Sequence, residues 1–178
     1  MKKTGWFSLT RLGALICCAA MMLSGCSAPK GAKTPEELIK RYMDALSHEK
    51  YEAVLDLLPD EIIEYGMEYL DGDREDIVGF VKYAAHDYYW LQKAHLTAHP
   101  GYSFVITEQQ SEFPEEKKPG SVLMEEKGVR LYVKDALSIS VEVDTGAEEA
   151  VEGYFFLIRI DDRWYMTSVA GDDEFFRY

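Results

Sequence analysis

The stretch LSISVEVD, residues 137–144, decides the fold, because it holds the clearest strand pattern in the chain. Apolar and polar residues alternate over all of its positions. Since successive side chains of a strand point to opposite faces, this alternation predicts a β-strand with one face in the core and the other in solvent. Such strands are typical of antiparallel sheets.

Further strands are predicted on both sides of this stretch. Residues 154–160 are apolar at nearly every position, as expected of a strand covered on both faces. Residues 163–169 complete a hairpin with it across Asp161-Asp162. Upstream, the alternation over residues 102–107 also indicates a strand. Because the turns after Asp144 and before residue 163 are short, these strands should run antiparallel.

A loop and a short helix are predicted over residues 113–127. Residues 113–120 contain two prolines and two lysines, which indicates a loop. Residues 121–127 are predicted to form a short helix that ends at Gly128.

Helical signals fill the region before residue 95. Thr34-Pro35-Glu36-Glu37 combines an N-cap threonine, a proline at the first helical position and a glutamate three residues after the cap, which is a capping box. Apolar residues then recur at helical spacing up to Leu46. Three more helices are predicted: residues 51–58 before Pro59, a helix with Ile62, Ile63 and Met67, and a helix from Asp73 to about Leu91.

Helices followed by an antiparallel sheet make an α+β arrangement. The capped helix, the second helix ending in LDLLP, the SISVEV strand and the closing Arg163-Trp164-Tyr165 hairpin resemble the small NTF2-like (cystatin-like) domains of bacterial lipoproteins. The resemblance covers residues 34–170. It implies N-terminal helices packed on a curved, mainly antiparallel sheet of about four strands, a cone whose mouth can be a pocket. We place this domain at residues 34–171 and an acidic, aromatic tail at residues 172–178.

Residues 1–25 have the pattern of a signal peptide. Lys2, Lys3 and Arg11 precede an apolar run over residues 12–23. This run is far shorter than the roughly 20 residues that a membrane-spanning helix needs, so it predicts a targeting segment and not an anchor.

Leu23-Ser24-Gly25-Cys26 resembles the lipobox of bacterial lipoproteins. The resemblance implies cleavage before Cys26, a diacylglyceryl thioether on its sulfur and, in some bacteria, a further acyl chain such as palmitate. Two or more chains give stable attachment. We therefore expect a lipid-anchored protein on the extracytoplasmic face of a membrane, with residues 26–33 as a tether. The alternative is an ordinary secretory peptide with a cysteine near its cleavage site.

The charge and cysteine counts exclude several function classes. The 178 residues include 19 basic and 32 acidic ones, and loss of residues 1–25 removes three basic residues, which changes the net charge from −13 to −16. Such a surface does not suit nucleic-acid binding. Cys17 and Cys18 leave with the signal peptide and Cys26 takes the lipid. The mature chain therefore keeps no thiol for a disulfide, a nucleophile or a metal site.

One string has a catalytic interpretation. Asp144-Thr145-Gly146-Ala147 matches the catalytic tetrapeptide of aspartic proteases, in which two aspartates share a proton. Such a protease needs a second loop of this kind and a flap, yet only 32 residues follow Gly146. A hairpin turn at the end of the strand is the favoured interpretation.

Histidine and acidic residues offer two metal-site interpretations. His95 and His99, with His86 as a third, have a spacing that metal ligands can use, but surface positions are favoured. The acids of residues 71–76 fail the EF-hand pattern because Asp76 stands where glycine is required, and a turn with a helix cap explains them. We expect no cofactor and no metal.

Aromatic residues are the remaining candidates for a binding site, since they supply apolar area with a polar handle. For most of them a place in the core is the simpler interpretation. The candidates for ligand contact are Tyr88, Tyr102, Phe104, Phe156 and Trp164. We expect a domain that binds a small hydrophobic molecule, an envelope component or a partner protein without catalysis. Two alternatives stay open: an isomerase- or hydrolase-like enzyme with a carboxylate in the cone, and an accessory domain of a cell-wall or transport complex.

Overall fold

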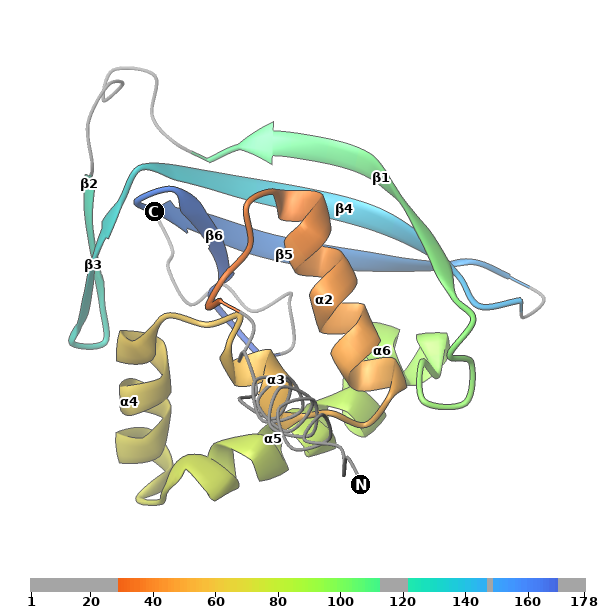
Figure 1. Ribbon diagram of the computed structural model, residues 1–178, viewed down its shortest axis with the longest axis horizontal. Helices are drawn as coiled ribbons and strands as arrows, with labels where there is room; N and C mark the ends of the chain where they lie inside the picture. Colours follow the sequence, from red (N-terminus) through yellow and green to blue (C-terminus); the bar gives the residue numbers. More distant parts are fainter. Residues whose placement is uncertain (1–28, 113–121, 147–148, 170–178) are drawn as a thin grey trace, which may run out of the picture.

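The computed structural model describes residues 29–112, 122–146 and 149–169 (Figure 1). The predicted signal peptide, Cys26, the 113–120 loop and the 172–178 tail lie outside these ranges. The helices are α2 (Pro35–Ser47), α3 (Glu52–Leu55), α4 (Asp60–Leu70), α5 (Arg74–Asp87) and α6 (Tyr89–Ala94). The strands are β1 (Ser103–Ser111), β2 (Val122–Glu126), β3 (Val129–Val133), β4 (Asp135–Asp144), β5 (Val151–Ile160) and β6 (Arg163–Met166).

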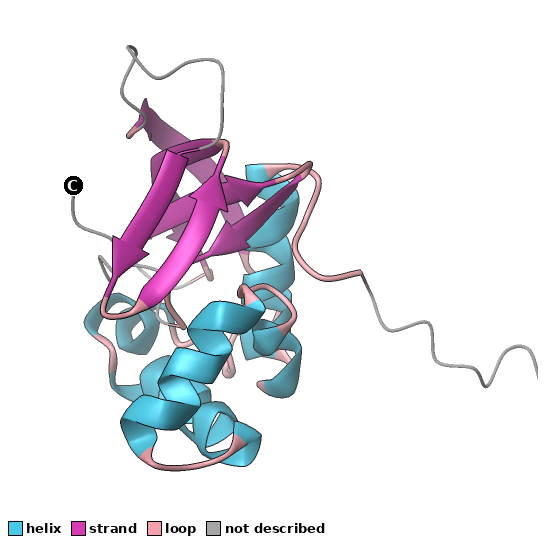
Figure 2. Ribbon diagram, turned by 90° about the vertical axis from the view of Figure 1, so that its left-hand side faces the viewer, coloured by secondary structure: helices cyan, strands magenta, loops and turns pink. Residues whose placement is uncertain are grey.

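The helices form one layer and the main sheet the other, so the predicted α+β class is confirmed (Figure 2). The sheet has the order β1-β4-β5-β6, with every neighbouring pair antiparallel, and β2 and β3 form a separate two-stranded sheet. This arrangement agrees with the NTF2-like fold that the resemblance implies. No helix in the described ranges is both long and apolar enough to span a bilayer.

Strand β4 is central to the sheet, as the LSISVEVD pattern predicts. Its apolar side chains at Leu137, Ile139, Val141 and Val143 are buried, and the serines and Glu142 between them are more exposed. β5 departs from the prediction of two covered faces. Tyr154 is 50% exposed, and only from about Phe156 onward are both faces of β5 largely covered.

The predicted helix over residues 121–127 is wrong, because residues 122–126 form strand β2, which pairs with β3. Lys127 and Gly128 connect the two strands with positive φ angles of 50° and 86°. A two-residue turn of this kind matches the twist of a hairpin and favours glycine at its second position. Gly128 therefore marks a hairpin turn and not a helix end.

Helix α2 begins as the capping box predicts, with one shift. The Thr34 hydroxyl accepts a hydrogen bond from the Glu37 amide at 3.1 Å. The Glu37 carboxylate accepts from the amide of Lys33 at 3.0 Å, one residue before the usual partner. The buried face of α2 crosses the sheet, where the Tyr42 ring packs edge-on against Phe155 at 5.6 Å.

Helix α4 contains Ile62, Ile63 and Met67 as predicted, but two other helices are shorter than predicted. α3 ends at Leu55, and the predicted helix over residues 73–91 is interrupted at Tyr88, whose ψ of 135° is extended. The interruption turns α6 onto the sheet, where Trp90 packs against Phe155 at 5.5 Å. Gly153 makes room for this ring, since a Cβ there would lie 2.9 Å from it. Aromatic rings thus fill the space between α2, α6 and β5.

The segment before α2 is fixed to the sheet. Ala32 and Trp164 exchange two backbone hydrogen bonds of 2.9 and 2.8 Å. Gly31 has a φ of 62°, and a Cβ there would lie 2.7 Å from the Trp164 carbonyl oxygen. The last residues of the predicted 26–33 tether therefore belong to the folded body.

Candidate functional site

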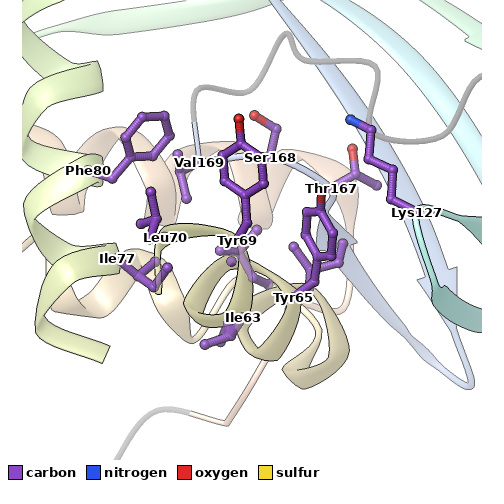
Figure 3. Close-up of a pocket in the computed structure, with 13 residues that line it drawn as sticks. Ile63, Tyr65, Tyr69, Leu70, Ile77, Phe80, Lys127, Thr167, Ser168 and Val169 are labelled. Atoms are coloured by element: carbon purple, nitrogen blue, oxygen red, sulfur yellow. The ribbon is translucent and has the colours of Figure 1, made fainter. Parts of the chain in front are cut away.

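A cavity of about 490 Å³ opens between α4, α5 and the residues that follow β6; we call it the α4–α5 cavity (Figure 3). Its floor is formed by Leu58, Ile62 and Ile63, which are buried. Thr167, Ser168 and Val169 contribute the side nearest the sheet, and Lys127 reaches it from the β2–β3 turn. Segments more than 100 residues apart in sequence therefore meet around one space.

The helical period of α4 explains why this cavity is apolar. Ile62, Gly66 and Tyr69 recur at intervals of three and four residues, which places them on one helix face. Acidic residues occupy exposed positions of the same helix: Glu61, Glu64 and Glu68. α4 thus turns its apolar face to the cavity and its charges to solvent.

Gly66 lets α4 and α5 approach each other closely. A Cβ at this position would lie 2.8 Å from the Cδ1 atom of Ile77 on α5. Glycine inside a helix costs about 1 kcal/mol relative to alanine, so its presence needs a local reason. The reason here is the contact between the two helices that wall the cavity.

Two pairs of aromatic side chains lie on the helices that wall the cavity. Tyr65 and Tyr69 stack with ring centroids 6.0 Å apart, and Phe80 stacks on Tyr83 at 6.3 Å. Tyr69 is 75% exposed, and Leu70 beside it is 39% exposed. Contiguous exposed apolar groups of this kind mark binding surfaces more often than ordinary surface.

Polar groups gather at one end of the cavity. Lys127 and Thr167 lie at the end away from Phe80, Leu70 and Ile77 (Figure 3). The Thr167 hydroxyl donates to the Phe156 carbonyl at 3.3 Å, so its proton is already used. Among the described residues that line the cavity, Lys127 is the charged one and none is acidic.

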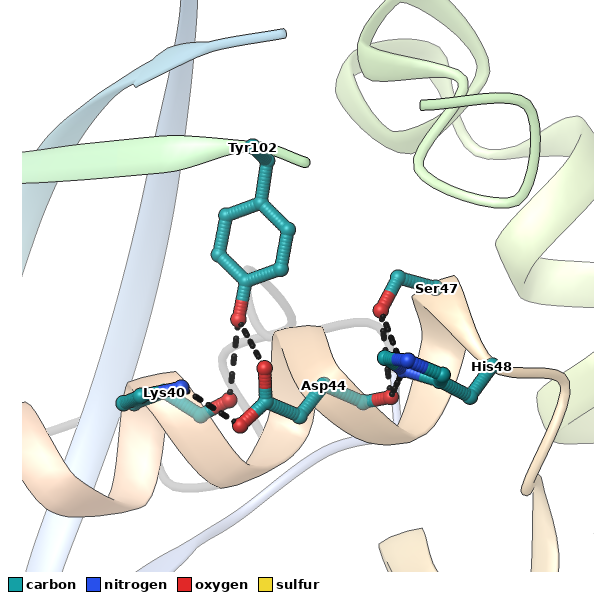
Figure 4. Close-up of polar contacts among 5 residues, drawn as sticks. All are labelled: Lys40, Asp44, Ser47, His48 and Tyr102. Atoms are coloured by element: carbon teal, nitrogen blue, oxygen red, sulfur yellow. Dashed lines mark hydrogen bonds and ion pairs between the residues drawn. The ribbon is translucent and has the colours of Figure 1, made fainter. Parts of the chain in front are cut away.

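A second polar site joins α2 to the start of β1; we call Lys40, Asp44 and Tyr102 the α2–β1 clamp (Figure 4). The Tyr102 hydroxyl donates to Asp44 Oδ1 at 2.7 Å and also lies 3.3 Å from the Lys40 carbonyl oxygen. Lys40 Nζ donates to Asp44 Oδ2 at 2.7 Å. Both carboxylate oxygens of Asp44 are therefore engaged within the chain.

The protonation states of the clamp suit structure better than catalysis. Burial raises the pKa of Asp44, but the hydrogen bonds from Lys40 and Tyr102 outweigh it and hold the pKa below its ordinary value. Burial and the bond to Asp44 raise the pKa of Tyr102. A weakly basic carboxylate and a hydroxyl that already donates to it are poor partners for proton transfer. The clamp therefore does not support the carboxylate-enzyme alternative.

The five predicted ligand contacts are not gathered at the α4–α5 cavity. Tyr102 and Phe104 border a shallow depression beside the clamp. Tyr88 and Phe156 are half-buried against the core, and Trp164 is buried below the Arg159 guanidinium, 5.7 Å from its ring centre. Sequence reasoning missed Tyr65, Tyr69 and Phe80. The signal available was the Tyr65–Tyr69 spacing of one helical turn, which places both rings on the same side of the helix.

The remaining motifs have structural roles. The Asp144 carboxylate accepts a hydrogen bond from the Gly146 amide at 2.8 Å, so this pair forms a turn. The Asp73 carboxylate caps α5 by accepting from the amides of Glu75 and Asp76, and the Asp73 amide donates to the Asp76 carboxylate, which completes a capping box. His95 ends α6 in the left-handed conformation. In the ranges that the structure describes, no three His, Cys, Asp or Glu side chains gather as metal ligands.

Comparison with protein-family models, with curated proteins and with solved structures finds no match for this chain.

Proposed function

We propose that this protein is a lipid-anchored lipoprotein of the extracytoplasmic face, whose α+β domain binds a small, mainly apolar molecule in the α4–α5 cavity without chemical conversion. The observation that carries the proposal is the apolar cavity of about 490 Å³ beside exposed aromatic rings. Ligand pockets are typically about 300–1,000 Å³ and mostly apolar, with few polar groups that orient the ligand.

The lack of conversion is supported by the distribution of polar groups. The described cavity lining holds hydroxyls and Lys127 but no carboxylate or histidine that could serve as a general base. The Asp44–Tyr102 pair, which has the composition of an acid–base site, belongs to the separate α2–β1 clamp. Binding is thus the activity that this site favours.

The binding proposal is tested with N-phenyl-1-naphthylamine, a neutral apolar dye whose fluorescence rises in an apolar site. We expect saturable fluorescence with the full mature chain. Leu70→Asp should weaken it about tenfold or more, because a carboxylate would stand in the apolar wall. Leu123→Asp is the matched control, since Leu123 on β2 is 40% exposed and Leu70 is 39% exposed. Absence of saturable binding, or equal loss in both variants, would overturn the proposal.

The anchoring proposal has its own test. Metabolic labelling with a fatty acid should mark the wild-type protein in the membrane fraction. Cys26→Ala should leave the protein unlabelled and soluble, because the variant has no sulfur to carry acyl chains. Without acyl chains the protein has no lipid anchor. A variant that stays firmly bound to the membrane would contradict the lipid anchor.

A further inference from the structure

We infer that the chain itself supplies an occupant of the α4–α5 cavity: Phe175 and Phe176, in the segment of residues 170–178, dock on the apolar wall until a ligand displaces them. This inference rests on the proposed function and names the regulation of the same site. Residues 170–178 lie outside the described residues. The docking is inferred from where the described chain ends, from the cavity wall and from the sequence of the segment.

The chain enters this segment directly from the cavity. Thr167, Ser168 and Val169 all line the cavity, so the segment begins at its wall. The hydroxyl of Tyr42, a fully buried residue, donates to the Val169 carbonyl oxygen at 2.8 Å. The Thr167 hydroxyl donates to the Phe156 carbonyl oxygen at 3.3 Å. These bonds hold the starting point of the segment in place beside the site.

The direction and the length of the chain allow the rings to reach the apolar wall. In the view of Figure 3, the chain runs from Thr167, at the polar end of the cavity, to Val169, on the side where Leu70 and Phe80 stand. Six residues lead from Val169 to Phe175, which span roughly 20 Å at full extension. This length is ample for a segment that starts at the cavity wall and doubles back onto it.

The composition of the segment suits an apolar wall. Three of its nine residues are aromatic, compared with 13% of the whole chain. Each phenylalanine ring can bury about 150–250 Å² of surface. On the cavity wall, Leu70 and Phe80 are 39% and 38% exposed and offer a surface of the same kind. Docking is favoured because it removes both apolar surfaces from water together.

Attachment to the cavity wall makes even weak docking effective. A short connection between two binding partners gives an effective concentration of about 1 mM. Docking with an intrinsic Kd of about 0.1–1 mM would therefore leave the cavity free for roughly a tenth to a half of the time. The apparent affinity for a ligand is reduced by that fraction. The segment thus weakens ligand binding without abolishing it.

A second copy of the chain is the competing occupant, because its segment could dock in the cavity of a neighbour. The chain carries 32 acidic and 19 basic residues, so two copies repel each other. An effective concentration of about 1 mM within one chain also exceeds the micromolar protein concentrations of a binding assay. Docking within one chain is therefore favoured, and exchange between copies becomes an outcome of the test.

The test compares the binding of N-phenyl-1-naphthylamine by full mature chains at several protein concentrations. Phe175→Ser together with Phe176→Ser removes both rings and keeps the length of the segment. We expect this double variant to bind the dye about two- to tenfold more tightly than the wild type, because its cavity is always free. The gain should be the same at every protein concentration.

A matched control makes two changes in the same segment and keeps the rings. Asp172→Ser together with Asp173→Ser should bind the dye as the wild type does, because the rings cover the apolar wall and the carboxylates do not. Circular dichroism spectra like that of the wild type would show that each variant is folded.

A free peptide with the sequence of residues 170–178 gives an independent measurement. It should displace the dye from the double variant that lacks the rings, with an inhibition constant of about 0.1–1 mM. The same peptide with serine at both phenylalanine positions should not displace it. A tighter peptide should accompany a larger gain in dye affinity, since both report the same contact.

Each outcome decides one claim. If the variant without the rings binds the dye as the wild type does, or more weakly, the rings are not a displaceable occupant, and the cavity function stands. A gain that changes with protein concentration would mean exchange between copies and would overturn docking within one chain. If the dye binds neither chain, the proposed function fails and this inference fails with it.

Discussion

The α2–β1 clamp and the α4–α5 cavity differ in how their polar groups are used. In the clamp, Lys40 and Tyr102 both bind the Asp44 carboxylate, so the charges satisfy one another. In the cavity, apolar side chains enclose about 490 Å³ and a lysine stands at one end. The comparison teaches that a set of residue types common in catalytic sites can serve a structural contact, while the cavity proposed for binding is lined by residues with little reactivity.

The largest expected effect comes from the core that lies between α2 and α6. Phe155→Ala should lower the free energy of unfolding by about 3–5 kcal/mol, because the ring is buried between Tyr42 and Trp90. Chemical denaturation followed by tryptophan fluorescence measures the loss. A loss below about 1.5 kcal/mol would mean that the core can close around the gap, and the contrast between a filled core and an open cavity would weaken.

A smaller loss is expected at the clamp. Tyr102→Phe removes the donor to Asp44 and should cost about 1 kcal/mol, since the pair is partly exposed to solvent. Dye binding in the α4–α5 cavity should be unchanged. Weaker dye binding in this variant would show that the two regions are coupled and are not separate sites.

The clamp should also appear in the pH dependence of stability. The pKa of Asp44 in the folded protein lies below its ordinary value of 3.8, so the charged clamp contributes stability above that pH. This contribution should disappear as the pH falls through the lower, folded pKa. Asp44→Asn should therefore be less stable than the wild type at about pH 6 but converge with it at about pH 2 in denaturation experiments. Parallel pH profiles would contradict the assigned role.

The smallest effect on stability is expected at the cavity rim. Tyr69 is 75% exposed, so Tyr69→Ala should change the unfolding free energy by no more than about 0.5 kcal/mol. Dye affinity should nevertheless fall about threefold or more, because the ring borders the opening. A variant that loses stability but keeps dye binding would place Tyr69 among the structural residues.

Sequence patterns predicted the parts of the fold that depend on local order. The alternation in β4 and the Thr34 cap each depend on a few consecutive residues, and both are confirmed. The sequence analysis misses the β2–β3 hairpin because its strands are short and the Lys127-Gly128 turn signal also fits a helix end. The burial of β3 against α4 and β5 becomes visible only in the folded chain.

The cavity could not be predicted in the same way. Its lining comes from α4, α5, the β2–β3 turn and the residues after β6, which only the folded chain brings together. Phe80 and Lys127 give no sign in the sequence that they border one space. The lipid on Cys26 depends instead on a local motif, and it stays a prediction that the described residues do not test.

If Cys26 carries a lipid, the pairing of Ala32 with Trp164 sets how far the domain can stand from a bilayer. Arg41 donates to the carbonyl oxygens of Pro29 and Gly31, so the chain is held from about residue 29 onward. Only a few residues then separate Cys26 from the fixed body. At full extension, the chain from Cys26 to Gly31 would span about 18 Å. Lys30 pairs with Asp60, the first residue of α4. A lipid on Cys26 would thus hold the cavity helix within a short radius of the headgroups, where membrane-derived amphiphiles are most concentrated.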